Sequence, residues 1–384
     1  MPHIEGRIVH DADSHTMETQ DWLTPFADPN VRDDIQAVFD RIFASRHEQF
    51  QTTLAQQDDP GFRSRDASEF MARKNHLAIG SFRKDDRPLA LDLIGVAKQL
   101  VFPTSANVLM EAMEHGNDYD LLYGMARASN RAQLDFCSVD DRLLPVCNVP
   151  LADIERASAT AKDAIEIGAR ALLIPWACPK HHATSHIGLD PVWAQAQEAG
   201  IPIVFHVGAA DFVLPKAHAN NGLPAVPDFH GGDENFRSIS YMAIPSGPQQ
   251  ALSMMILDGV LDRFPRLKVG VIELGAIWLP GFMRQLEAAM LSFGRHEERL
   301  QALELQPQEY VTRQIRVTPY PTEPAGWIID NAGSATCMFS SDYPHIEGGR
   351  NPYGRFKTST EGLPEPTLDA FFRGNFEDML GIQG

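Results

Sequence analysis

Short apolar runs alternate with amphipathic helical stretches over most of the chain. An apolar run near residue 8 is followed by runs at residues 98–103, 143–149, 169–175, 201–206, 267–273, 314–319 and 335–341. Most neighbouring runs are separated by a stretch with the 3–4 spacing of a helix. Strands that alternate with helices pair in parallel through right-handed crossovers. The pattern predicts an α/β fold, and eight such units favour a (β/α)₈ barrel over an open doubly wound sheet.

Three stretches depart from this alternation. Residues 19–90 are polar and irregular, with helical pieces near 33–49 and 67–75, and are too long for a simple crossover. We expect them to form an insertion, as a lid or a dimer arm, within a single domain of residues 1–384. A loop rich in Gly and Pro runs from Gly208 to about Arg237, and residues 367–380 form a C-terminal helical tail. No GxGxxG follows a strand, which argues against a dinucleotide-binding domain.

Composition narrows the class of partner. The chain has 33 Lys and Arg against 51 Asp and Glu, a net charge of −18, which argues against nucleic acids and anionic membranes. No apolar run approaches the ~20 residues of a membrane span, and no signal-peptide pattern begins the sequence. We therefore expect a cytoplasmic protein. Its four cysteines lack CxxC spacing and are expected to be free thiols: Cys137, Cys147, Cys178 and Cys337.

Polar side chains that can bind a metal stand at the ends of four predicted strands. Asp13 and His15 follow the first strand and, being two residues apart, share one face. His206 ends the fifth strand, Glu273 the sixth and Asp342 follows the eighth. Each alone has a simple structural explanation, such as a hydrogen-bonded core histidine or a turn aspartate. Together they would meet at one barrel mouth, where several buried carboxylates are costly without a cation. We predict one divalent metal ion, zinc first, with manganese or iron as alternatives.

The same segments resemble the amidohydrolase superfamily. More narrowly, they are similar to the amidohydrolase 2 branch that includes aminocarboxymuconate-semialdehyde decarboxylase. The resemblance rests on residues 11–15 (Asp-Ala-Asp-Ser-His), 203–208, 264–276, 341–345 (Ser-Asp-Tyr-Pro-His) and the tail 372–381. It implies a distorted TIM barrel with one divalent metal.

The resemblance also implies roles for individual residues. It assigns Asp13, His15, His206 and Asp342 as metal ligands, with Asp13 replacing the first histidine of the usual His-x-His pair. Glu273 stands where the family usually has a histidine that acts on water or substrate. Because that position differs, the resemblance does not fix the reaction.

Three functions fit these residues. The first is metal-dependent hydrolysis of an ester, thioester, amide or lactone of a small organic acid, with Asp342 or Glu273 accepting a proton from an activated water. The second is non-oxidative decarboxylation of an aromatic or conjugated acid, with Glu273 or Asp342 as the proton donor. The third is a binding barrel without catalysis, which the four retained ligand-type residues disfavour.

The substrate pocket is less well defined by the sequence. Four side chains stand just beyond predicted strand ends and are candidates to line it: Trp176, Tyr320, Tyr343 and His345. For each one, ordinary packing is an equally good explanation. The expected partner is a small-molecule substrate, and a homodimer is a further expectation.

Overall fold

A curled parallel sheet forms the centre of the computed structural model, which describes residues 2–208, 214–224 and 238–382. Residues 209–213 and 225–237 of the predicted long loop lie outside the described residues. The sheet order is β1-β3-β4-β5-β6-β7-β8, and β2 also pairs with β3. The strands are β1 (His10–Asp11), β2 (His15–Thr16), β3 (Lys98–Pro103), β4 (Leu143–Asn148), β5 (Ala171–Leu173), β6 (Ile203–His206), β7 (Val269–Ile272) and β8 (Ile315–Val317).

The segment after β8 closes the sheet into a barrel. Residues 335–341 were expected to be a strand, but the structure gives them only isolated bridges: Cys337 pairs with Val317 on one side. On the other side Tyr343 bridges to Ser14, and Asp342 N donates to Asp13 O at 3.0 Å. The last unit therefore joins β8 to the first strands without regular strand geometry. The predicted distorted (β/α)₈ barrel is confirmed.

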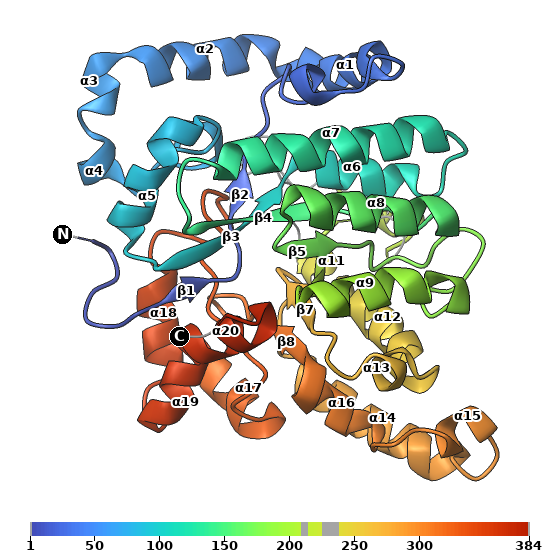
Figure 1. Cartoon of the computed structure of the whole chain (residues 1–384). Helices are drawn as coiled ribbons and strands as arrows, with labels where there is room; N and C mark the ends of the chain where they lie inside the picture. Colours follow the sequence, from blue (N-terminus) through green and yellow to red (C-terminus); the bar gives the residue numbers. More distant parts are fainter. Residues whose placement is uncertain (1, 209–213, 225–237, 383–384) are drawn as a thin grey trace.

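Helices cover the outside of the barrel (Figure 1). The best defined is α8 (Ile154–Ile167), where the Asp153 side chain accepts a hydrogen bond from Arg156 N and Gly168 ends the helix at φ 114°. The others are α5 (Arg87–Ile94), α6 (Ser105–Met113), α7 (Tyr119–Cys137), α9 (Asp190–Ala199), α11 (Ser238–Ala243), α12 (Ser246–Leu257), α13 (Val260–Arg263), α14 (Leu279–Phe293), α15 (Glu298–Gln301), α16 (Pro307–Gln314), α17 (Ala325–Ala332) and α18 (Pro352–Ser359). Among the described residues, no helix is both long and apolar enough to cross a membrane.

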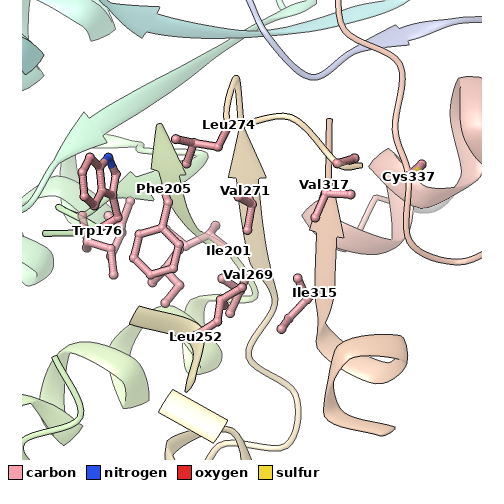
Figure 2. Close-up of a cluster of buried hydrophobic side chains, with 14 of the residues drawn as sticks. Trp176, Ile201, Phe205, Leu252, Val269, Val271, Leu274, Ile315, Val317 and Cys337 are labelled. Carbon is pink, nitrogen blue, oxygen red and sulfur yellow. The ribbon is translucent and has the colours of Figure 1, made fainter. Parts of the chain in front are cut away.

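Side chains alternate between the two faces of the barrel strands. Those facing outward, such as Phe205, Val271 and Val317, pack with Leu252 of α12 in the layer between strands and helices (Figure 2). Those facing inward form a separate cluster with the C-terminal helix α20 (Asn375–Leu380): Leu100, Phe102, Leu144, Val146, Leu173, Val204, Ile272, Phe376, Met379 and Leu380. The predicted tail therefore helps to fill the barrel interior.

The segment between β2 and β3 lies along one side of the barrel (Figure 1). Its helices α1 (Arg32–Phe43) and α2 (His47–Asp58) replace the single helix predicted near 33–49, and only α4 (Asp66–Glu69) forms where 67–75 was predicted. Apolar residues of α1 pack on α7 in a second hydrophobic cluster, for example Phe39 and Tyr123. A lid or dimer arm at residues 19–90 stays a prediction.

Candidate metal centre

Five of the predicted residues meet at the carboxyl ends of the strands. Asp13 lies between β1 and β2, His15 begins β2, His206 ends β6 and Glu273 follows β7. One ligand atom from each of these four lies within 4.8 Å of the others. A second group with the same spacing joins His15 and Glu273 to Asp342 and His345. The two groups overlap and describe one site.

The imidazoles of His15 and His206 lie close to the carboxylate oxygens of the site. His15 Nε2 lies 3.3 Å from Asp13 Oδ1, 3.6 Å from Asp342 Oδ1 and 3.7 Å from Glu273 Oε2. His206 Nε2 lies 3.4 Å from Asp13 Oδ1 and 3.1 Å from Glu273 Oε2. Residues that are 329 positions apart in sequence, Asp13 and Asp342, thus face the same imidazole.

The donor set fits a divalent cation. His15 and Asp13 are each 1% exposed, and no hydrogen bond within the described part of the chain reaches His15 Nε2 or Asp342 Oδ1. Buried polar atoms without such a bond need another partner. Two imidazole nitrogens with carboxylate oxygens suit Zn²⁺, Mn²⁺ or Fe²⁺. A bound ion would neutralise carboxylates whose joint burial is otherwise costly.

Burial and close charges shift the pKa values of the site in opposite directions. Burial alone would raise the pKa of Asp13, but its close contacts with the His15 and His206 imidazoles hold it below its usual value. Burial raises the pKa of Asp342 to about 6, although the His345 charge opposes this shift. Burial also lowers the pKa of His15 well below its usual value, which keeps the imidazole neutral as a ligand.

The backbone is held in an unusual conformation at two of these residues. Glu273 has φ 54° and Asp342 has φ 53°, in the left-handed region that non-glycine residues rarely adopt. Glu273 is anchored on both sides, since its N–H donates to Thr318 Oγ1 at 2.9 Å and its carbonyl accepts from Tyr320 Oη at 2.8 Å. Such conformations persist where the surrounding structure enforces them, and they concentrate at functional sites.

A polar layer beneath the site fixes the first ligands in place. Asp11 accepts hydrogen bonds from Ser341 N and Oγ and from Gln99 Nε2, which ties the first strand to the segment before Asp342. The fully buried Arg87 donates to His15 O at 3.0 Å and to Ser14 Oγ at 2.9 Å. Arg87 could not be identified from the sequence, because a single arginine at the start of a helix carries no signal for burial.

The four candidate pocket residues separate into two pairs. His345 stacks on His15 with ring centroids 3.9 Å apart, and Tyr320 contacts Glu273, so both lie at the site. Tyr343 is fully buried and its hydroxyl donates to Ile79 O at 2.6 Å. Trp176 lies in the outer core (Figure 2) and lines a cavity of about 770 Å³ between α12 and α14, whose lining includes none of the five ligand-type residues.

Glu18, three residues after His15, has structural partners in the backbone. Its carboxylate accepts hydrogen bonds from the backbone N–H groups of Thr104, Ser105 and Ala106 at 3.0, 2.8 and 3.2 Å. These N–H groups begin α6, where a carboxylate caps the unpaired donors of a helix. Glu18 therefore fixes β2 to α6 rather than taking part in the cluster.

Comparison with known protein families matches residues 75–382 to the Amidohydrolase family. The match covers most of the chain, so the protein belongs to this family and is a metal-dependent enzyme, a hydrolase or a decarboxylase. This excludes the catalytically silent barrel. A divalent metal is expected for the family, and the cluster at the strand ends provides a site for one. A search of curated proteins found no match.

Solved structures share the fold over nearly the whole chain. An amidohydrolase from Mycobacterium avium subsp. paratuberculosis K-10 has 20% identity and a TM-score of 0.73, covering 98% of this chain and 100% of its own. The 5-carboxyvanillate decarboxylase from Novosphingobium aromaticivorans DSM 12444, with manganese and 4-hydroxy-3-methoxy-5-nitrobenzoic acid, has 18% identity and a TM-score of 0.61 (99% and 97%). The 2,6-dihydroxybenzoate decarboxylase from Rhizobium has 13% identity and a TM-score of 0.62 (99% and 100%).

Proposed function

We propose that this enzyme catalyses the metal-dependent, non-oxidative decarboxylation of an aromatic or conjugated carboxylic acid. The observation that carries the proposal is the ring of buried carboxylates and imidazoles, which leaves room for one ion beside an acidic side chain, Glu273. Similarity in fold to two decarboxylases of aromatic acids supports it. Hydrolysis, the first expectation from the sequence, becomes the second candidate.

In this proposal Asp13, His15, His206 and Asp342 hold the ion, as the family resemblance implies. A divalent cation bound there would hold the substrate carboxylate and orient the carbon that bears it toward Glu273. Glu273 carries the proton that replaces the departing carboxyl group. Two observations support this role: Glu273 is 8% exposed, more than the four ligands, and its backbone is fixed by Thr318 and Tyr320.

Hydrolysis remains a second candidate because an ionised Glu273 is also a suitable base. Its Oε2 lies 3.1 Å from His206 Nε2, so the carboxylate stands beside the atoms that would bind the ion. In that reaction Glu273 would accept a proton from water instead of donating one to carbon. The two reactions differ in product, since only decarboxylation releases CO₂.

The test is a product assay on manganese- or zinc-loaded protein with aromatic carboxylates, esters and thioesters. Release of CO₂ from a carboxylate, with uptake of one solvent deuteron into the product in D₂O, supports decarboxylation. Acid release from an ester or thioester without CO₂ from any carboxylate contradicts it and supports hydrolysis. A homodimer and a cytoplasmic location stay predictions, to be tested by light scattering and cell fractionation.

A further inference from the structure

The segment between β2 and β3 places a lysine beside the metal centre. Lys74 lies between two residues whose positions are fixed. Arg73 pairs with Asp66 and Glu69 within the same segment, and its guanidinium lies 3.5 Å from the centroid of the Phe62 ring. On the other side, Asn75 N donates to Pro344 O at 2.9 Å, which joins the segment to the loop between α17 and α18. The backbone of Lys74 is thus held against the loop that carries Asp342.

The ammonium group of Lys74 is buried without a hydrogen-bond partner within the described chain. No carboxylate of that part of the chain lies within ion-pair distance of it. The charges that act on it come from Asp342, Glu347 and Arg350, all in the loop between α17 and α18. Burial lowers the pKa of Lys74 to about 8, an effect that Asp342 and Glu347 partly offset, so the group is protonated at pH 7.

Arg87 is another buried cation near the site, but its guanidinium already has hydrogen-bond partners. Arg87 donates to Ser14 Oγ, His15 O, Gly80 O and Gln99 Oε1, so its guanidinium has a structural role. Arg350 is exposed. A desolvated ammonium is costly unless it meets an anion. Lys74 therefore has both the charge and the free donor capacity for an anionic ligand.

We propose that Lys74 and the adjoining loop between α17 and α18 form an anion-binding subsite, in which the ε-ammonium binds a second carboxylate of the substrate, separate from the one that the metal ion would hold. This inference rests on the proposed function, because it adds the substrate's own charge to the metal site. It gives the β2–β3 segment a role in selecting substrates that carry a negative charge. It also gives a role to a buried ammonium group that has no hydrogen-bond partner within the described chain.

The experiment measures binding rather than turnover. Calorimetric titration of manganese-loaded protein at pH 7 uses isophthalate, an aromatic diacid, and its monomethyl ester, which keeps one carboxylate for the metal ion. A hydrogen bond between charged groups is worth about 10- to 100-fold in affinity. We expect Lys74→Met to weaken binding of the acid by that factor and binding of the ester by less than about twofold, and Lys74→Arg to restore most of the loss. The matched control, Lys84→Met, removes a lysine that pairs with Asp135 at the surface.

The outcomes separate this inference from the proposed function. An unchanged affinity of Lys74→Met for the acid, with normal metal content and melting temperature, overturns the subsite and leaves decarboxylation standing. Lysine-dependent binding of the acid, without CO₂ release from any carboxylate, overturns decarboxylation and leaves the subsite standing. Failure of the wild-type protein to bind the acid counts against the subsite. An equal loss of acid and ester binding shows a structural role only.

Discussion

His206 Nε2 lies 3.1 Å from Glu273 Oε2, although the two residues end different strands, β6 and β7. These strands are neighbours in the sheet, and His206 pairs in register with Ile272, the residue before Glu273. The side chains of His206 and Glu273 therefore meet because the register of two parallel strands brings their ends together. The contact joins a proposed ligand to the proposed proton donor.

Replacing Glu273 with Gln removes the acidic proton and keeps the shape of the side chain. We expect the rate of CO₂ release to fall by about 10²- to 10⁴-fold, which is the usual contribution of a positioned acid or base. Metal content should stay at the wild-type level. The measurement is kcat with an acid that the wild-type enzyme decarboxylates, beside metal analysis of the same sample. Loss of the metal in Glu273→Gln would instead make Glu273 a ligand.

Replacing Arg87 with Met tests the polar layer beneath the site. The substitution leaves the buried acceptors Ser14 Oγ, His15 O and Gln99 Oε1 without their donor. Each buried group left unsatisfied costs about 1–3 kcal/mol, so we expect the free energy of unfolding to fall by at least about 2 kcal/mol. Urea titration measures this, with the exposed Arg266→Met as control. A loss below about 0.5 kcal/mol, the usual scatter for surface substitutions, would show that Arg87 is dispensable.

Two buried glutamates make the stability of the fold depend on pH. Glu111 lies in α6, and Glu114 is the residue after it. Burial raises the pKa of Glu111 well above its usual value and raises that of Glu114 to about 7. The folded state therefore binds more protons than the unfolded state above the usual glutamate pKa. Stability should fall as pH rises from about 4.5 through 7 and beyond, by about 1.4 kcal/mol for each unit of pKa shift.

Glu111→Gln removes part of this dependence. We expect its melting temperature to exceed that of the wild type at pH 8 by more than it does at pH 5, because the glutamine needs no proton to remain buried. Glu198→Gln, at an exposed position, should leave the pH profile unchanged. Parallel profiles of Glu111→Gln and the wild type between pH 5 and 8 would argue that Glu111 is not buried in its protonated form.

The architecture and the site residues differ in how far the sequence could predict them. Apolar runs bounded by turn residues located β1 and β3 to β8, since burial on both faces requires such runs, but not the two-residue strand β2. The apolar run at 335–341 was predicted as a strand, but it bonds to its neighbours only at isolated points. Its composition does not distinguish such a segment from a regular strand. The helix expected near 33–49 is interrupted by a short 3₁₀ helix at Ala44–Arg46, which separates α1 from α2.

The convergence of Asp13, His15, His206 and Asp342 followed from topology, because parallel strands of a barrel end at one rim. The position of Lys74 did not follow. It depends on how an irregular segment docks through Asn75 on Pro344, and that contact leaves no periodic pattern in the sequence. Trp176 shows a second limit of prediction from sequence. A residue just past a strand end can turn outward into the core instead of toward the site.

The most direct test of the account is elemental analysis of the native protein beside a His206→Ala variant, with the exposed His296→Ala as control. We predict about one equivalent of a divalent transition metal in the wild type and the control. We predict less than about a tenth of that in His206→Ala, with the fold retained by circular dichroism. A wild-type protein without bound metal after incubation with zinc, manganese and iron, or a His206→Ala variant that binds as much metal as the control, would contradict the metal centre.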